Sequence, residues 1–132
     1  MATPKPKYDL SQIKAIVEKY VEGAKEMIYF SAPSRSLACV IEVLLCQDHE
    51  VHKIITDGIL QLKDSDFSHS LFQWDTVMDV YGLENYQKNN WYIKFNLKEE
   101  DGQVFLENVS FHPPVKSLTL IDDRILLPIE DS

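Results

Sequence analysis

The sequence is short of basic residues, of cysteine and of long apolar runs, and each shortage bears on a class of protein. Its 132 residues hold 13 lysines and arginines against 21 aspartates and glutamates, which gives a net charge of −8. Nucleic-acid binders usually show a basic patch or stripe, and this composition does not indicate one. The two cysteines are too few for a metal site made of cysteine alone and are expected to be buried, reduced thiols. No apolar run approaches the roughly 18 residues that span a bilayer, so no membrane partner is expected.

Sequence signatures of several enzyme classes and of exported proteins are also missing. The chain has no glycine-rich phosphate loop, no serine or cysteine nucleophile motif and no nucleotide fingerprint. Met1–Lys7 lacks the apolar core of a signal peptide, so a cytoplasmic location is expected. The length favours one domain over residues 9–128. Residues 1–8 are expected to be a disordered lead-in and residues 129–132 a frayed tail.

The first half of the chain has helical periodicity. From residue 9 to residue 26, apolar residues recur about every 3.6 positions and form one stripe. A second helix is predicted through residues 37–45, with Ser34 or Ser36 as its N-terminal cap. A third is predicted from about Glu50 to Leu62. The first half therefore supplies helices with one buried face each.

The second half changes to the period-two alternation of β-strands. Residues 90–97 place Trp91, Ile93, Phe95 and Leu97 on one face and leave Tyr92 and Lys94 on the other. Glu99–Gly102 is a predicted hairpin turn. Further strands are predicted over residues 77–83, 103–112, 116–121 and 124–128, and residues 27–31 are predicted to be a short strand or an extended connector. Together the two halves predict an α+β fold in which N-terminal helices pack on an antiparallel β-sheet.

The stretch Lys63–Tyr81 joins the helical half to the strand half and gathers residues with chemistry. It opens with a turn-like Asp-Ser-Asp and then contains His69, Trp74 and the triplet Asp-Val-Tyr that ends at Tyr81. Trp74 is expected to pack on the sheet in preference to stacking on a base. A junction of this kind is a common place for a functional site.

Four pieces of the chain, in order over roughly residues 9 to 112, resemble a known pattern. They are Asp9–Lys14, Leu62–Ser70, Met78–Tyr81, and Trp91–Lys94 followed by Val109–His112. These pieces resemble motifs of the MqsR-type toxins. Asp9–Lys14 resembles the opening Leu-Ser-x-Ile/Val-Lys helix of that family, and Leu62–Ser70 resembles its Leu-x-x-Ser-Asp-Phe-Tyr-Lys-Ser segment. Met78–Tyr81 resembles the end of its Trp-Gln-Asp-Val-Tyr, and the two parts of the fourth piece resemble its Tyr-x-Lys and Ser-Phe-Lys strands. Those proteins are small ribonucleases of bacterial toxin–antitoxin modules with a RelE-like α+β fold. The resemblance implies the same fold, mRNA as substrate and a cognate antitoxin as partner; a homodimer is a further candidate assembly.

The chain departs from this family at active-site positions. His69 stands where the family has a lysine, Met78 where it has a glutamine, and His112 where it has the lysine of Ser-Phe-Lys. Tyr92 keeps the family's catalytic residue type at its position, and Lys94 is retained beside it. The resemblance therefore supports the fold more strongly than the activity.

Metal-free RNA cleavage needs a base, an acid and donors for the phosphate, and the chain offers each. His69 and His112 are candidates for base and acid because histidine titrates near neutral pH. Tyr92 is a third candidate catalytic residue, Lys94 would bind the phosphate, and Tyr81 would be a further donor to the substrate. No cofactor is expected.

Two alternative readings are kept open. The changes at three family active-site positions, together with the acidic composition, fit a protein that has the toxin fold but has lost catalysis and acts as a binding or regulatory module. Separately, His49 and His52 are neighbours on a helix and could bind a metal. They do not form a His-Glu-x-x-His motif, and a solvated helix N-terminus is the expectation there.

Overall fold

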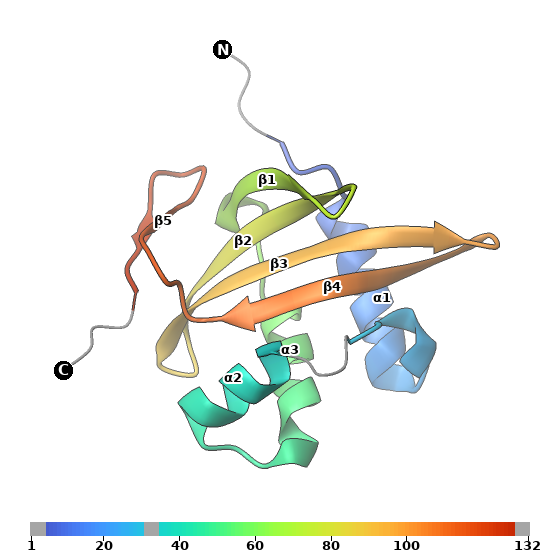
Figure 1. Ribbon diagram of the computed structural model, residues 1–132, viewed down its shortest axis with the longest axis horizontal. Helices are drawn as coiled ribbons and strands as arrows, with labels where there is room; N and C mark the ends of the chain where they lie inside the picture. The colour runs from blue at the N-terminus through green and yellow to red at the C-terminus, as the bar shows by residue number, and fades with distance from the viewer. Residues whose placement is uncertain (1–4, 31–34, 129–132) are drawn as a thin grey trace.

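Four antiparallel strands form the central sheet of the computed structural model, which describes residues 5–30 and 35–128 (Figure 1). The strands follow one another in chain order across the sheet, and each pairs with the next. They are β1 (Phe67–Gln73), β2 (Thr76–Tyr86), β3 (Asn89–Glu100) and β4 (Gln103–His112). A separate two-stranded hairpin follows, made of β5 (Leu118–Thr119) and β6 (Ile125–Leu126).

The helices precede the sheet in the sequence and lie on one of its faces (Figure 1). The α-helices are α1 (Leu10–Glu22), α2 (Arg35–Leu44) and α3 (Val51–Leu60), with short 3-10 turns η1 (Lys25–Met27), η2 (Asp48–Glu50) and η3 (Asp64–Asp66). The predicted α+β class, with N-terminal helices packed on an antiparallel sheet, is confirmed. None of the helices that the structure describes is long and apolar enough to cross a membrane.

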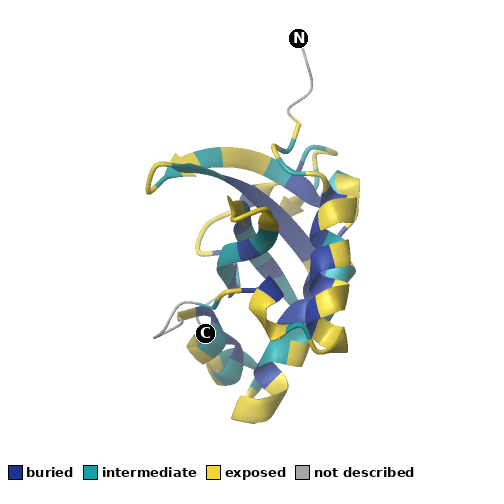
Figure 2. Cartoon of the chain, turned by 90° about the vertical axis from the view of Figure 1, so that its right-hand side faces the viewer, coloured by how far each residue is buried: buried dark blue, intermediate teal, exposed yellow. Residues whose placement is uncertain are grey.

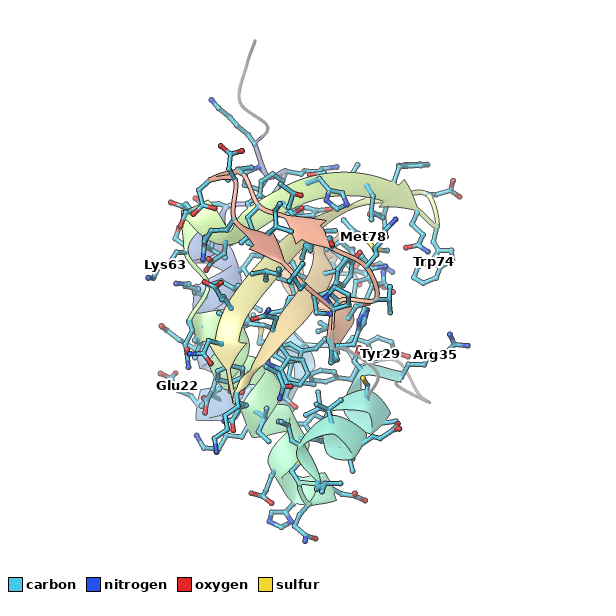
Figure 3. All side chains as sticks on the ribbon, turned by 90° about the vertical axis from the view of Figure 1, so that its left-hand side faces the viewer. Glu22, Tyr29, Arg35, Lys63, Trp74 and Met78 are labelled. Carbon is cyan, nitrogen blue, oxygen red and sulfur yellow. The ribbon has the colours of Figure 1, made fainter. Side chains whose placement is uncertain are left out.

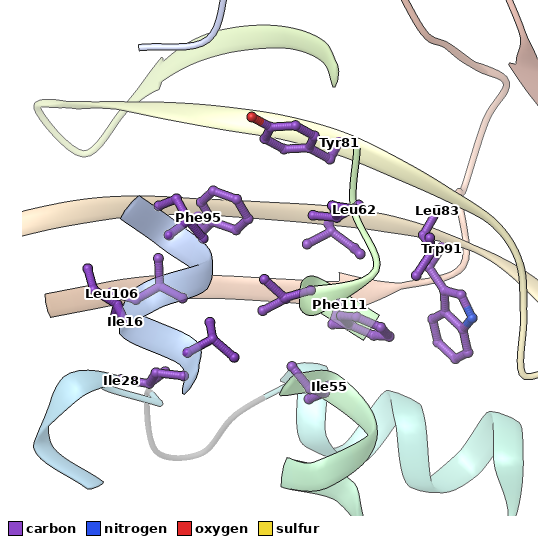
Figure 4. Packing of buried hydrophobic residues seen from close by; sticks show 14 of the residues in the cluster. Ile16, Ile28, Ile55, Leu62, Tyr81, Leu83, Trp91, Phe95, Leu106 and Phe111 are labelled. Atoms are coloured by element: carbon purple, nitrogen blue, oxygen red, sulfur yellow. The ribbon is translucent and has the colours of Figure 1, made fainter. Parts of the chain in front are cut away.

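The main core lies between the helices and the sheet. Figure 2 shows the buried side of α1 turned toward the sheet and its exposed side turned to solvent. Trp91, Phe95 and Phe111 from β3 and β4 are fully buried there, in one cluster with helical residues such as Ile16 and Ile55 (Figure 4). Each such side chain contributes on the order of 1.5–3 kcal/mol by leaving water. The alternation predicted for Trp91, Ile93 and Phe95 is therefore confirmed.

Strand β1 was not predicted, although it lies inside the stretch Lys63–Tyr81. Its residues alternate poorly in hydrophobicity because it is an edge strand, with one side paired to β2 and a shift in register between Phe67 and His69. The shift places Phe67 in the core and sends His69 and Leu71 to the other face. The prediction that Trp74 packs on the sheet is wrong, because Trp74 lies in the β1–β2 turn and is 71% exposed.

Two predictions around α2 need correction. Of the two alternatives for residues 27–31, the strand is wrong, because only an isolated parallel bridge joins Ile28 to Leu106; Ser31 lies outside the described residues. Ser34 also lies outside them, and Ser36 is not a cap. Ser36 Oγ instead donates to the Val109 carbonyl at 3.1 Å and accepts from the Phe111 amide at 2.9 Å. Ser36 thus ties α2 to β4, which positions the end of that strand.

Part of the expected lead-in is held against the sheet. The backbone amides of Lys7 and Tyr8 donate to the two oxygens of the Asp79 carboxylate at 3.0 and 2.9 Å. Asp79 is fully buried on the helix side of β2 and also accepts from Ser70 Oγ at 2.6 Å. These bonds satisfy the buried charge. The ordered domain therefore begins before residue 9, and the predicted tail at residues 129–132 lies outside the described residues.

The β5–β6 hairpin covers part of the opposite face of the sheet (Figure 3). Leu118, Leu120 and Leu126 form a second small core with Val80 of β2. Gly82 permits this close approach, because a Cβ there would lie 2.7 Å from Leu126 Cδ1. The predicted C-terminal hairpin is confirmed, although its strands are shorter than expected. The remaining part of this sheet face is left open.

Candidate functional site

The open part of that face forms a pocket of about 540 Å³. Its floor comes from β1, β3 and β4, and its rim from residues 115–119, which lead into β5. His69, Tyr92, Lys94 and His112 all line it. The pocket therefore gathers four of the five residues that the sequence singled out for a site.

Strand register explains why these residues meet. Tyr92 of β3 is paired with His112 of β4, and Lys94 is paired with Val80 of β2, which in turn is paired with His69 of β1. Side chains in register on neighbouring strands lie on the same face of the sheet. His69, Val80 and Lys94 therefore lie side by side across β1, β2 and β3. Tyr92 and His112 lie side by side across β3 and β4, two residues away along β3.

His69 is fixed by the C-terminal hairpin. Ser68 Oγ lies 2.6 Å from the Thr119 carbonyl, to which it donates, and 2.9 Å from His69 Nδ1. Since the single hydroxyl proton goes to Thr119, the imidazole must donate from Nδ1 to Ser68. In its neutral form, His69 therefore carries its proton on Nδ1, and its Nε2 is an acceptor without a partner in the described part of the chain.

His112 is held in an equivalent way. Its Nδ1 lies 2.8 Å from the Pro113 carbonyl, which can only accept, so Nδ1 carries a proton. Its ring stacks on Tyr92, with the ring centres 4.8 Å apart and the planes 16° from parallel. Nε2 is again the atom left to exchange a proton. Because a carbonyl accepts from Nδ1 in both protonation states, the ring need not turn when Nε2 gains or loses its proton.

Lys94 supplies positive charge at one side of the pocket. Its Nζ donates to Gln73 Oε1 at 2.9 Å and lies 5.8 Å from the centre of the Trp74 ring. One of its three protons is used by Gln73, so two remain for a ligand. Partial burial lowers the pKa of Lys94 from its ordinary value. Partial burial likewise raises the pKa of Tyr92, which keeps the phenol protonated as a donor at neutral pH.

The pocket is lined by basic residues, although the chain as a whole is acidic. Its described lining residues include two lysines, Lys94 and Lys116, and two histidines, but no aspartate or glutamate. Partial burial, and then the charge of Lys116, lower the pKa of His69 from its ordinary value. His69 is therefore neutral at pH 7 and able to accept a proton. The aspartates and glutamates that give the chain its net charge of −8 therefore lie outside the described lining of the pocket.

Tyr81 does not belong to this site, and its prediction as a substrate donor is wrong for this structure. Its side chain is fully buried in the main core, where it packs against Phe67 and Phe95 at ring-centre distances of 5.4 and 5.6 Å. Figure 4 shows its ring among the core residues. Tyr81 occupies an odd-numbered position of β2, and these positions face the helices. Met78, on the pocket side of β2, is fully buried and has no hydrogen-bond donor, only a weakly accepting sulfur.

Sequence reasoning missed several residues that shape the pocket: Ser68, Gln73, Lys116 and Thr119. Three of them depend on how the C-terminal hairpin folds back over β1, and no local pattern reveals that. Gln73 reaches the pocket through its hydrogen bond to Lys94, and the poor alternation of β1 gave no signal for it. Arg35 and His112 also line a second hollow next to this pocket, between α2 and residues 113–115.

The second candidate site, at His49 and His52, finds no support. His52 packs edge-on against Phe30, with ring centres 4.9 Å apart. Among the residues that the structure describes, no three histidine, cysteine, aspartate or glutamate side chains are grouped as metal ligands would be. Here His52 is a packing residue at the start of α3.

No protein-family model matches the sequence of this chain, and no curated protein matches it either.

Proposed function

We propose that the pocket is the active site of an mRNA-cleaving endoribonuclease that works without a metal ion, as expected of a toxin in a type II toxin–antitoxin module. The main support is that two histidines line one pocket, and each has Nδ1 hydrogen-bonded to a fixed acceptor and Nε2 without a partner among the described residues. Paired acid and base groups of this kind are what RNA transesterification requires. The resemblance to MqsR-type toxins suggests the class of reaction, although both histidines stand where that family has lysines.

His69 is the proposed general base. Its lowered pKa keeps Nε2 unprotonated at neutral pH, and Nε2 takes the proton of a ribose 2′-hydroxyl. The 2′-oxygen then bonds to phosphorus. The charge that develops on His69 is shared through Nδ1 with Ser68 and the Thr119 carbonyl.

His112 is the proposed general acid. As the bond from phosphorus to the 5′-oxygen breaks, protonated Nε2 of His112 gives its proton to the leaving oxygen. The products are a 2′,3′-cyclic phosphate and a free 5′-hydroxyl, so atoms and protons balance. The Pro113 carbonyl holds the ring in place throughout.

Tyr92 and Lys94 are proposed to hold the phosphate. The pentavalent transition state carries extra negative charge on its non-bridging oxygens, and donors fixed in advance stabilise it. The Tyr92 hydroxyl and the two remaining protons of Lys94 point to such a role, because both side chains line the pocket with the histidines. Lys116 on the rim adds a second cation. A cognate antitoxin that covers this pocket, in a cytoplasmic setting, follows as part of the same proposal.

The test is cleavage of single-stranded RNA by the purified protein in EDTA, with product ends identified. We expect 2′,3′-cyclic phosphate ends, and we expect His69→Gln and His112→Gln each to lower the rate by about 10² or more. His49→Gln is the matched control, because His49 is an exposed histidine in η2, outside the pocket. Absence of cleavage, or equal rates in all four proteins, would refute the proposal.

The competing proposal, a toxin-fold binding module without catalysis, is favoured by the net charge of −8 and by the buried Met78. If the protein is such a binding module, no RNA cleavage occurs in the same assay under any condition. The two proposals are therefore separated by one experiment.

A further inference from the structure

The tip of the β1–β2 hairpin carries a tryptophan that the fold does not need. Trp74 and Asp75 form the turn, with φ angles of 53° and 59°. A two-residue turn with left-handed backbone at both positions favours Asn-Gly or Asp-Gly, and a bulky residue there is a conformational outlier. Because Trp74 is 71% exposed, packing does not offset the strain. Strain that the fold does not explain suggests a functional reason for the residue.

The position of Trp74 connects it to the pocket. Lys94 Nζ lies 5.8 Å from the centre of its ring and donates to the neighbouring Gln73. Lys94 also lines the pocket, so one lysine bridges the pocket and the aromatic ring. Figure 3 shows Trp74 at the outer edge of the molecule, where its ring is open to solvent.

We infer that Trp74 is a stacking platform for a base of single-stranded RNA that lies next to the phosphate held at Lys94. The inference rests on the proposed function, which places that phosphate in the pocket. Exposed aromatic rings beside cationic grooves bind unpaired bases of any sequence, because every base has a flat face to stack. Asp75 lies next to Trp74 in the same turn, and its carboxylate repels phosphate. The hairpin tip therefore favours contact with an RNA base over contact with the sugar-phosphate backbone of the RNA.

The protein offers matched controls for this inference. Phe72 is equally exposed, at 71%, but strand alternation puts it on the face opposite Gln73 and Leu71, away from the pocket. The other tryptophan, Trp91, is fully buried, and its Nε1 donates to the Tyr86 carbonyl at 2.7 Å. A bound base can therefore quench the fluorescence of Trp74 directly but not that of Trp91.

The experiment uses a fluorescently labelled 2′-O-methyl oligoribonucleotide, which binds but lacks the hydroxyl needed for cleavage. Affinity is measured by anisotropy for the wild-type protein, Trp74→Asn and Phe72→Ala. An unlabelled copy is titrated against tryptophan fluorescence. We expect saturable quenching in the wild type, about a tenfold weaker affinity for Trp74→Asn, and unchanged affinity for Phe72→Ala. Since asparagine suits the turn, Trp74→Asn should unfold at the same temperature as the wild type or a higher one.

The outcomes separate this inference from the proposed function. Equal affinity of Trp74→Asn and wild type, an equal loss in Phe72→Ala, a lower unfolding temperature that accounts for the loss, or no binding at all would each overturn it. Cleavage of unmodified RNA is assayed in parallel. If RNA quenches Trp74 but is not cleaved, the stacking site is supported and the ribonuclease activity is refuted. If RNA is cleaved but Trp74→Asn binds it as tightly as the wild type does, the ribonuclease activity is supported and the stacking site is refuted.

Discussion

Two tyrosines show how a single residue's role depends on which side of a strand it occupies. Tyr81 and Tyr92 sit on neighbouring strands and both look like candidate donors in the sequence. Tyr81 points into the main core with its hydroxyl buried, and burial raises its pKa far above the ordinary value. Tyr92 lines the pocket and stacks on His112. Only Tyr92 can contact a substrate.

Tyr81→Phe is expected to stabilise the protein by about 1 kcal/mol, because a buried polar group without a partner costs free energy. Among the described side chains, the Tyr81 hydroxyl is a buried polar group with no hydrogen-bond partner. Chemical denaturation measures the change. Tyr92→Phe is the matched variant: it should keep stability near the wild-type value and slow RNA cleavage. A Tyr81→Phe protein that unfolds more easily, or that loses cleavage as Tyr92→Phe does, would contradict this assignment.

At the scale of elements, the β5–β6 hairpin completes the site. It contributes Thr119 to the hydrogen-bond chain of His69, and the segment before it contributes Lys116. The hairpin is fastened at its other end by Arg124. Arg124 Nη2 lies 2.7 Å from Asp66 Oδ1, and that carboxylate is nearly fully buried. The Ile121 amide also donates to the Phe67 carbonyl at 2.8 Å.

Arg124→Ala is expected to lower the free energy of unfolding by about 2 kcal/mol, because it leaves the buried Asp66 carboxylate without its cation. The figure is below that for a fully buried pair, since the Arg124 side chain is 34% exposed. Lys53→Ala removes the exposed ion pair with Asp57, 2.9 Å apart, and serves as the control. It should cost less than about 1 kcal/mol. Equal effects of the two substitutions in denaturant unfolding would show that Arg124 does not fasten the hairpin.

At the scale of the whole molecule, charge is distributed unevenly. The chain carries a net charge of −8, while the pocket is lined by lysine and histidine without carboxylates among the described residues. A local positive site on an acidic protein attracts a phosphate at short range. The net negative charge of the chain opposes tight, non-specific binding of long nucleic acid.

Stability is expected to fall as the pH drops from 7 toward 5. Partial burial and nearby lysines lower the pKa values of His52 and His69 from 6.5 in the folded protein. Below about pH 6.5 the unfolded chain therefore binds more protons than the folded one, and protonation favours unfolding. Carboxylates with lowered pKa, such as Asp9, which accepts hydrogen bonds from Ser11, lose their contribution only near and below pH 3.8.

Thermal unfolding across this pH range tests the expectation. The double variant His52→Gln, His69→Gln should flatten the slope between pH 7 and 5. An unchanged slope would mean that other groups cause the pH dependence.

Periodicity in the sequence was enough to predict the fold class and most of the helices and strands. Periodicity near 3.6 marked the helices, and period-two alternation marked the faces of β3, so Tyr92 and Lys94 were assigned to one side correctly. Local pattern carries this information because helices and strands each expose one face to solvent. His69 and His112, in contrast, were singled out through the resemblance to MqsR-type toxins.

Tertiary structure alone decided which of these residues share a pocket. The register of β1 to β4 brought His69, Tyr92, Lys94 and His112 onto one face and sent Tyr81 into the core. The C-terminal hairpin packs next to β1, and the hydrogen bonds from Ser68 to Thr119 and from His69 to Ser68 then determine which ring nitrogen of His69 carries the proton. Both depend on contacts between segments far apart in the chain, for example Ser68 and Thr119, and pairings of that range leave no periodic trace in a single sequence.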